Sequence, residues 1–471
     1  MKKAFLIGAS ALFLAGCVSA PPTEPQLTKL TAEKVGLAIE SSPAIAPAWW
    51  KAFGDPELNR LVDEALKGNP SLAAAMARLR EAQSQLATTS AATLPQINGD
   101  ARSIRERLSK NYVIPPPYAG SWQWVGTAAA NLSWSLDLFG KEAAQVDRAK
   151  ATAEAAALDA EAARLALAGA VTNAYVQLAQ AYALIDAAKD TVRQREEVHQ
   201  LVSQRFKAGL DNPATAKQSS AQLALAREEL LRDEAQRDAA VHMLAALTGK
   251  GIDGYAIARP RLNETALSLP QTLSADLLAR RADIAASKAR VTAALAGRQA
   301  AHQAFYPDIN LLGTAGFSAL GMTTLFTSSS LQYGGGAAIH LPIFDAGVLR
   351  ANYAGATARL DEAVADYNQS LLTAVRQTAD AITGLRSVDA QATEQVQALA
   401  DATESYNLTV SRYKNGLASE LSLLSVEDTL IQARRQSALL QAEKASVRVA
   451  LVIALGGGFD ATQSNKSESH E

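Results

Sequence analysis

Apolar residues recur with helical spacing over two very long stretches of the chain. Residues 142–207 and 347–414 contain no proline and almost no glycine. Their apolar positions follow steps of three and four, interrupted by Lys189 in the first stretch and by Gln395 and Thr409 in the second. This spacing predicts helices about 100 Å long with coiled-coil packing. A second helix follows each one and ends near Gly249 or Gly456, so we expect two helical hairpins. The seam residues are Val171, Tyr175, Leu178, Tyr182, Ile185 and Val192 in the first stretch, and Leu385, Val388, Ala392, Leu399, Ala402, Tyr406 and Tyr413 in the second.

A different period, of two residues, runs from Trp122 to Leu138. Its even positions are apolar and carry Trp122, Trp124 and Trp134, while its odd positions are mostly polar or small. Trp124 and Trp134 lie about 33 Å apart along a strand, or roughly 25 Å in height once the strand is tilted, as the two aromatic girdles of a membrane barrel do. A soluble sandwich would alternate in the same way and is the alternative. Three further strands are expected at 97–107, 309–317 and 333–341.

The chain is duplicated. The sequence Arg205–Leu210 returns 207 residues later as Arg412–Leu417, with an aromatic residue, a lysine and a glycine in the same places. Each half also starts with a moderate helix, predicted at 55–92 with a break at Gly68-Asn69-Pro70 and at 274–304. We therefore divide the chain into a signal peptide (1–16), an anchor and extended tether (17–54), a first repeat (55–250), a linker (251–273), a second repeat (274–456) and a polar tail (457–471).

The amino terminus resembles a bacterial lipoprotein signal. Two lysines and an apolar stretch lead to Leu14-Ala15-Gly16-Cys17, which is similar to a lipobox. That resemblance implies lipidation at Cys17, and Val18 in place of an aspartate implies the outer membrane rather than the inner one. An ordinary secretory peptide with a chance cysteine is the alternative.

Four strands cannot close a barrel, and an open sheet edge cannot face lipid because its backbone groups would be unpaired. Other copies of the chain must then complete the barrel. Two copies would give 8 strands, too few for a solute path, whereas three would give 12 strands and a lumen. The helices alone also fit a solid coiled-coil stalk.

Composition excludes several classes of function. The chain has 45 Lys+Arg against 47 Asp+Glu, a net charge of −2, so nucleic acid is not an expected partner. With Cys17 as the single cysteine there is no disulfide framework. The five histidines show no metal-ligand spacing, and neither a phosphate loop nor a nucleophile elbow is present, so we expect no enzyme, no metal and no cofactor. His199 and His242 are predicted to be exposed helical residues.

Four short motifs carry a family resemblance. Leu136–Gly140, Leu341–Gly347, Arg280–Ile284 and Phe305–Pro307, with the lipobox and the duplicated halves, resemble the lipoprotein (NodT-type) branch of the TolC-like outer-membrane factor family. Ala282 stands where relatives commonly have proline, close to a helix start, and we expect a packing role for this motif.

The resemblance implies a mainly α fold with a membrane β-barrel. It further implies a homotrimer with a 12-stranded β-barrel in the outer membrane and a 12-helix α-barrel in the periplasm. The function expected from it is passive export of small molecules as the exit duct of a tripartite efflux pump, with a periplasmic adaptor and an inner-membrane resistance-nodulation-division transporter as partners. The alternatives are a type I protein-secretion duct working with an ABC exporter, and a lipid-anchored coiled-coil scaffold without a pore.

The same resemblance points to the hairpin ends as the functional parts. Their turns are expected to contact the adaptor, although plain helix capping also explains them. Relatives narrow the closed end just after the second turn with an apolar residue and an acidic ring. Here Leu421 keeps the apolar position, while Ser422 and Ser425 replace the acids; Glu420, Glu427 and Asp428 are nearby. The predicted docking residues are Arg205, Lys207, Gly209, Leu210, Arg412, Lys414, Gly416 and Leu417.

Overall fold

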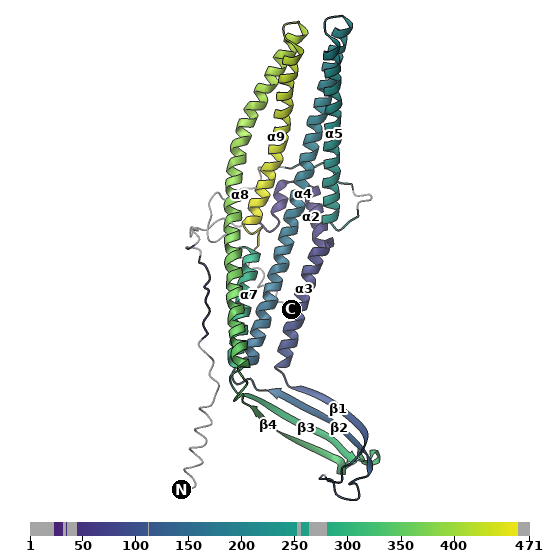
Figure 1. Cartoon of the computed structure of the whole chain (residues 1–471), viewed down its shortest axis with the longest axis vertical. Coiled ribbons are helices and arrows are strands. Elements are labelled where there is room, and N and C mark those ends of the chain that lie inside the picture. The colour runs from purple at the N-terminus through teal and green to yellow at the C-terminus, as the bar shows by residue number, and fades with distance from the viewer. Residues whose placement is uncertain are drawn as a thin grey trace. The chain divides into compact units, whose positions relative to one another are not determined.

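The computed structural model describes residues 23–31, 34, 45–111, 113–251, 256–262 and 280–459. Cys17, the predicted signal peptide, the start of the second repeat and the tail beyond residue 459 lie outside these ranges. In chain order the elements are η3 (Trp49–Phe53), α2 (Pro56–Gly68), α3 (Pro70–Ala92), β1 (Gln96–Arg107), β2 (Trp122–Ser135), α4 (Lys141–Lys207), α5 (Pro213–Leu247), α7 (Ala282–Gln303), β3 (Asp308–Leu320), η5 (Met322–Thr324), η6 (Ser328–Ser330), β4 (Leu331–His340), α8 (Val348–Lys414) and α9 (Glu420–Ala454) (Figure 1).

The two long helices, α4 and α8, begin and end within one residue of the predicted ranges, and each has 67 residues. The moderate helix of the first half is interrupted where expected, because α2 ends at Gly68 and α3 starts at Pro70. Asp55 caps α2 by accepting a hydrogen bond from the Glu57 N–H at 3.0 Å. The lack of proline inside the long stretches and the Gly68-Asn69-Pro70 break therefore predicted the bounds of these helices correctly.

The chain forms two compact units. The first holds Arg78–Ala156 and Ser287–Tyr367 together with residues 23–29, and the second holds Ala157–Ala286, Asn368 onward and Leu30–Ala77, as far as these are described. Each unit thus takes segments from both sequence repeats. The duplication is a feature of the sequence that does not divide the molecule into two separate bodies.

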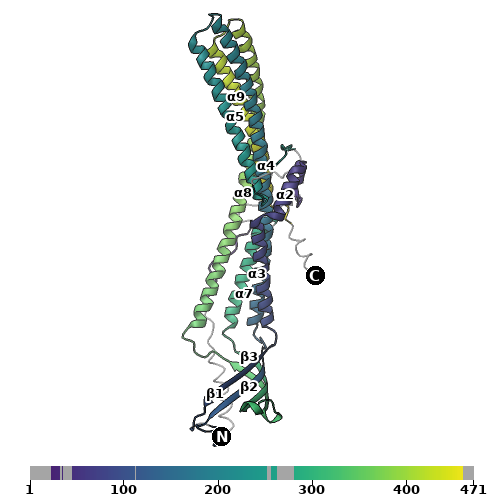
Figure 2. The same cartoon turned by 90° about the vertical axis from the view of Figure 1, so that its right-hand side faces the viewer.

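The first unit contains one four-stranded antiparallel sheet in the order β1-β2-β3-β4 (Figure 1; Figure 2 shows β1, β2 and β3 after a 90° turn). The central β2–β3 pair joins the two repeats, with Val125 opposite Leu320. The outer edges of β1 and β4 have no strand partner among the described residues. The sheet is therefore open on both sides.

The register separates two faces, as the alternation predicted. Ile97 pairs with Leu132 on the apolar face, whereas Asp100 and Asn131 lie on the polar face, where the Asn131 side chain donates to the Asp100 carboxylate at 2.8 Å. The predicted extension of β2 to Leu138 is wrong, because the strand ends at Ser135. Asp137 takes the left-handed conformation (φ 41°) and its carboxylate accepts hydrogen bonds from the first turn of α4.

The connector between β3 and β4 packs on the apolar face. Leu325 is buried, and its side chain lies against Gly126 of β2. Phe326 meets Phe317 edge to face, with ring centroids 5.7 Å apart. The connector thus covers part of the apolar face near the end of the sheet where β1 is connected to β2.

The core of the second unit is built where α2 crosses the hairpins. Trp49, Trp50 and Phe53 of η3 and the apolar face of α2 pack against α4, α5 and α9. Part of the predicted seam, Val171, Tyr175 and Leu178, is fully buried here. These residues pack against α2 as well as α9, so this stretch does more than join two long helices in a coiled coil.

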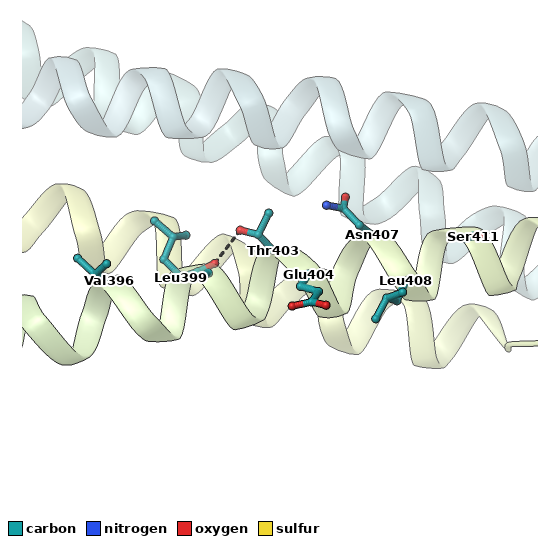
Figure 3. Close-up of a pocket in the computed structure, with 8 residues that line it drawn as sticks. Val396, Leu399, Thr403, Glu404, Asn407, Leu408 and Ser411 are labelled. Carbon is teal, nitrogen blue, oxygen red and sulfur yellow. Dashed lines mark hydrogen bonds between the residues drawn. The ribbon is translucent and has the colours of Figure 1, made fainter.

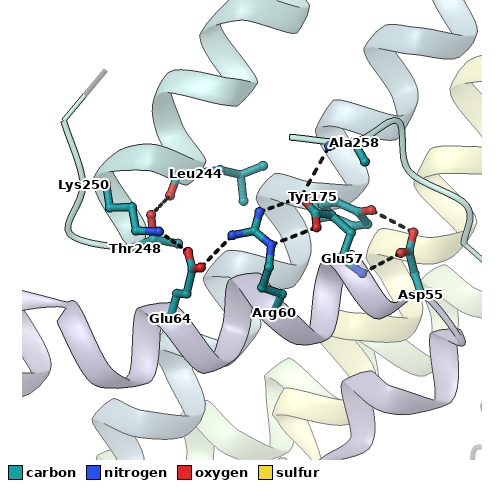
Figure 4. A network of polar contacts seen from close by, with 9 residues as sticks. All are labelled: Asp55, Glu57, Arg60, Glu64, Tyr175, Leu244, Thr248, Lys250 and Ala258. Carbon is teal, nitrogen blue, oxygen red and sulfur yellow. Dashed lines mark hydrogen bonds and ion pairs between the residues drawn. The ribbon is translucent and has the colours of Figure 1, made fainter. Parts of the chain in front are cut away.

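Polar contacts fix α2 in place (Figure 4). The Tyr175 hydroxyl donates to Asp55 at 2.8 Å, and burial raises the pKa of Tyr175, so the phenol stays protonated. Arg60 bonds Glu57 and Glu64, and Lys250 donates to Glu64 at 2.7 Å.

In each repeat, a side chain just before α3 or α7 donates a hydrogen bond to the end of that repeat's last helix. The Asn69 amide donates to the Leu247 carbonyl, and the Arg281 guanidinium donates to the Ala454 carbonyl, both at 2.9 Å. Arg281 is buried and also bonds Asp283. These contacts give the Arg280–Ile284 motif the packing role expected of it.

Candidate functional site at the hairpin ends

Both hairpins end in the same backbone turn. Gly209 and Gly416 are left-handed, with φ of 73° and 75°, a region that favours glycine. The Leu210 N–H donates to the Arg205 carbonyl at 3.0 Å, and the Leu417 N–H donates to the Arg412 carbonyl at 2.8 Å. This is the helix-ending pattern that the repeated sequence predicted.

A cap starts the returning helix in each case. The Asn212 side chain accepts a hydrogen bond from the Thr215 N–H at 3.0 Å, and the Ser419 hydroxyl accepts one from the Ser422 N–H at 3.2 Å. The turns are thus closed by local hydrogen bonds on both sides.

Three side chains join the two hairpin ends, and we call them the tip clasp: Arg205, Asp211 and Tyr413. Arg205 Nε donates to Asp211 Oδ2 at 2.9 Å, and the Tyr413 hydroxyl donates to the same oxygen at 3.0 Å. The Arg205 guanidinium lies 4.9 Å from the centre of the Tyr413 ring. Burial raises the pKa of Tyr413 to about 12, which keeps its proton available for this bond.

The other predicted docking residues do not join the clasp. Lys207, Arg412 and Lys414 are exposed, and no ion pair involves them within the described ranges. Leu210 and Leu417 are 65% and 70% exposed. Each hairpin end therefore offers an exposed leucine beside exposed positive charge.

The predicted constriction residues share one face of α9. Leu421 is 73% exposed, and Ser422 and Ser425 are exposed with it. Asp428 continues that exposed face, whereas Glu427 is fully buried on the opposite side. Of the nearby acids that the sequence left unassigned, Glu427 is thus excluded from this face.

Glu427 belongs to a second contact between the hairpins, which we call the buried arginine cluster: Arg195 of α4 with Glu427 and Asp428 of α9. Arg195 Nη1 donates to Glu427 Oε2 at 2.7 Å, and its Nη2 donates to Asp428. The other Glu427 oxygen has no hydrogen-bond partner among the residues that the structure describes. Burial raises the pKa of Glu427 to about 7, although Arg195 acts to lower it.

A third ionic contact joins α9 to α5. Arg435 lies 3.2 Å from Asp233, which is fully buried, and 2.7 Å from Glu229. The second hairpin is therefore held to both helices of the first by charged side chains.

Sequence reasoning missed the residues that carry these contacts. Asp211 stands where the second repeat has Ala418, and Arg195 continues the seam three residues beyond Val192. A charge at a seam position indicates a buried partner and was the available signal. The expected exposure of His199 was wrong, because this residue is half-buried and its Nδ1 lies 2.9 Å from the Ser219 hydroxyl, whereas His242 is exposed on its helix as expected.

One face of α8, between Val396 and Ser411, carries an open groove of about 590 Å³. Figure 3 shows Leu399, Thr403 and Asn407 along it, and Val396 and Leu408 are 72% and 60% exposed. On α5, Leu225 and Leu231 are 56% and 66% exposed. Apolar side chains thus remain uncovered on both α5 and α8.

The predicted girdle tryptophans differ in their surroundings. Trp122 and Trp124 are 62% and 47% exposed on the apolar face of the sheet. Trp134 is half-buried, and its indole N–H donates to the Thr93 carbonyl at 3.0 Å.

The described ranges contain neither a helix suited to cross a membrane nor a cluster of metal-ligating side chains. None of the helices there combines the length and the apolar character needed to cross a membrane. In the same ranges no three His, Cys, Asp or Glu side chains are grouped as metal ligands would be.

The sequence matches the model of the family described as "Outer membrane efflux protein" over residues 61–250 and 273–457. It is 37% identical over 368 residues to the fusaric acid resistance protein FusA of Burkholderia cepacia, covering 75% of this chain and 69% of FusA. It is 31% identical to the pyoverdine export outer membrane protein OpmQ of Pseudomonas aeruginosa, covering 98% and 97% of the two chains.

Solved structures give the same result for the fold. The outer membrane protein VceC of Vibrio cholerae superposes with a TM-score of 0.84 at 33% identity, over 89% of this chain and 100% of VceC. The CmeC outer membrane channel of Campylobacter jejuni gives a TM-score of 0.86 at 25% identity, over 95% and 98%.

Proposed function

The chain belongs to the outer membrane efflux protein family, whose members are exit ducts of efflux pumps, and on that premise we propose how it builds such a duct. Three copies form a homotrimer with a 12-stranded β-barrel in the outer membrane and a 12-helix α-barrel in the periplasm. Solutes move through it passively, and an inner-membrane transporter supplies the driving force through an adaptor.

The open sheet is the observation that carries this proposal. Among the described residues no strand pairs with the outer edge of β1 or of β4, and one face of the sheet is apolar while the other is polar. Pairing β4 of one copy with β1 of the next removes every edge and turns the apolar face toward lipid. The polar face then lines the lumen.

The helices support the same closure. Uncovered apolar residues include Leu225 of α5 and Val396 of α8, the latter drawn in Figure 3. Packing α8 of one copy against α5 of the next would cover both sets. Four long helices from each of three copies make the 12-helix wall.

The hairpin ends form the closed periplasmic end in this proposal. The tip clasp keeps the second hairpin against the first, and Leu421, Ser422 and Ser425 line the constriction. The exposed leucines and lysines at the turns dock the adaptor. Cys17 carries the lipid anchor, and the transporter is of the resistance-nodulation-division class.

We assign small molecules as the cargo. FusA is named for fusaric acid resistance and OpmQ for pyoverdine export, and both names describe small organic solutes. A polar lumen formed by residues such as Asn131 and Thr314 needs only to keep such solutes hydrated.

Single-channel recording in planar bilayers tests the duct. The purified full-length trimer should give small conductance steps, and the double variant Asp211→Asn, Tyr413→Phe should give steps at least several-fold larger because the clasp is lost. Phe206→Leu, at the exposed equivalent of Tyr413, is the matched control and should leave the steps unchanged. A protein that inserts but conducts no ions in any variant would support the scaffold alternative and overturn the proposal.

A further inference from the structure

Two arginines of β1 lie beside two tryptophans of β2. Arg105 is paired with Trp124 across the strands, and Arg107 is paired with Trp122. All four side chains are exposed and lie on the apolar face, at the end of the sheet that carries the β1–β2 connector. We call these four residues the basic-aromatic patch.

The patch has an excess of positive charge. The sequence at this end of the sheet, residues 101–126 and 314–333, contains Arg102, Arg105, Arg107 and Lys110 but only one acid, Glu106. Glu106 is opposite Gln123 and so lies on the polar face, away from Arg105 and Arg107. Within the described part of the chain neither patch arginine forms an ion pair, although Arg107 Nε donates to the Gly120 carbonyl at 3.3 Å.

A neighbouring copy would not neutralise this charge. In the trimer β4 of that copy would lie beside β1, and β4, from Leu331 to His340, contains no acidic residue. The β3–β4 connector, residues 321–330, has no charged residue at all. The two guanidinium groups would therefore remain available to an external anion.

We propose that the basic-aromatic patch binds the phosphate groups of an anionic lipid headgroup in the outer leaflet of the membrane. The proposal rests on the proposed function, which places this face of the sheet in lipid. Guanidinium groups bind phosphate with two parallel hydrogen bonds. Tryptophans favour the depth at which headgroups meet acyl chains.

The surroundings favour a lipid over free phosphate. Trp122 and Trp124 are 62% and 47% exposed. Below them on the same face come Ser103 and Gly126, against which Met322 and Leu325 of the β3–β4 connector pack, with the Ser103 hydroxyl donating to the Met322 sulfur. The face then continues with Ala101, Ala128 and Leu132, whose side chains offer no hydrogen bond to a small ion. A molecule with a phosphate beside acyl chains would satisfy both the arginines and this apolar surface.

The chain supplies a matched control. Arg102 lies on the same strand but is paired with Thr127, which places it on the polar face. Arg102→Gln removes the same charge from the same strand without touching the patch. Arg105→Lys, Arg107→Lys keeps the charge and removes the paired donors.

The experiment uses the full-length protein in nanodiscs of phosphatidylethanolamine with bisphosphorylated lipid A. Native mass spectrometry after release into detergent counts the lipid A that stays bound to each oligomer. We expect Arg105→Gln, Arg107→Gln to lower retention roughly tenfold and the lysine pair to lower it less. Arg102→Gln should retain as much as the unaltered protein, and dephosphorylated lipid A should not be retained.

Equal retention by the double glutamine variant, or an equal loss in Arg102→Gln, would overturn the proposal. Displacement of the bound lipid by excess inorganic phosphate would overturn it too, by making the site one for a free anion. Measuring the bilayer conductance of every variant distinguishes a failure of the patch assignment from a failure of the proposed function. If all variants conduct but lipid A retention never changes, the patch assignment alone fails; if the unaltered protein neither inserts nor conducts, the proposed function fails with it.

Discussion

The first and second hairpin ends carry the same turn, yet their aromatic residues have opposite surroundings. Phe206, before the first turn, is 40% exposed, whereas Tyr413, at the matching place before the second, is 1% exposed. Arg205 is bound by Asp211 and lies over the Tyr413 ring, while its counterpart Arg412 is exposed.

The difference continues along the returning helices. Glu427 of α9 is buried against Arg195, and the residue 207 positions earlier on α5 is Ser220. The duplicated hairpins have thus diverged at the positions that join them. The first hairpin supplies Arg195 and Asp211, and the second supplies the groups that these residues hold.

Removing Arg195 should break this arrangement most strongly. Arg195→Ala leaves the buried Glu427 carboxylate without its partner, which is expected to cost about 3–5 kcal/mol. Thermal unfolding followed by circular dichroism at neutral pH measures the loss. Arg193→Ala, an exposed arginine on the same helix, should change the midpoint very little; similar losses in the two variants would contradict a special role for the cluster.

Glu427 should make the junction sensitive to pH. Its pKa in the folded protein is about 7, above the ordinary value of 4.5, so the folded state binds more protons between these values. Its contribution to stability is therefore greatest in acid and falls as pH rises from about 4.5 through about 7, by an amount on the order of 3 kcal/mol.

Glu427→Gln should flatten that dependence, because the amide mimics the protonated acid at every pH. Unfolding midpoints at pH 5 and pH 8 should converge in this variant and stay apart in the unaltered protein. Glu404→Gln, an exposed acid on α8, is the control and should keep the original difference. Parallel profiles for all three proteins would rule out Glu427 as the source.

The tip clasp should respond more mildly. Tyr413→Phe keeps the ring beneath Arg205 but removes the hydroxyl that donates to Asp211, at a cost of about 1 kcal/mol. Hydrogen exchange at the amides of the second turn should become several-fold faster. Phe206→Tyr, which adds a hydroxyl at the exposed equivalent, should have no such effect; unchanged exchange in Tyr413→Phe would show that the clasp does not hold the end closed.

A change in the turn itself should have an effect about as small as that of the clasp variant. Gly416→Ala places a side chain in a left-handed conformation and should destabilise the protein by about 1 kcal/mol. Gly355→Ala, inside α8 with nothing near its added methyl group, should stabilise it by up to about 1 kcal/mol. Opposite shifts of the unfolding midpoint are the expected result, and shifts of equal sign would contradict the backbone explanation.

Helices, strands and turns could be predicted because each depends on neighbouring residues. The absence of proline defines α4 and α8, and Gly209 and Gly416 define their ends. The tip clasp could not be predicted, because Asp211 and Tyr413 are 202 positions apart and meet only when the hairpins pack. Likewise Glu427 has the sequence surroundings of a surface acid, and its burial depends on Arg195 of another helix.

Trp134 shows the same limit within the sheet. Its place on the apolar face followed from the period of two, but its hydrogen bond to Thr93 depends on how the chain turns from α3 into β1. The period of two predicts which face of a strand a side chain occupies, but it does not predict which other part of the chain contacts that side chain.

The pairing of β2 with β3 has a consequence for how the protein is made. Val125 and Leu320 are 195 residues apart, and the segment between them includes the whole first hairpin. A nascent polypeptide that stops before β3 possesses only the β1–β2 ribbon, which is too small to persist by itself in water. The four-stranded sheet can therefore form only after the second half has been made, when the first helical hairpin is already complete.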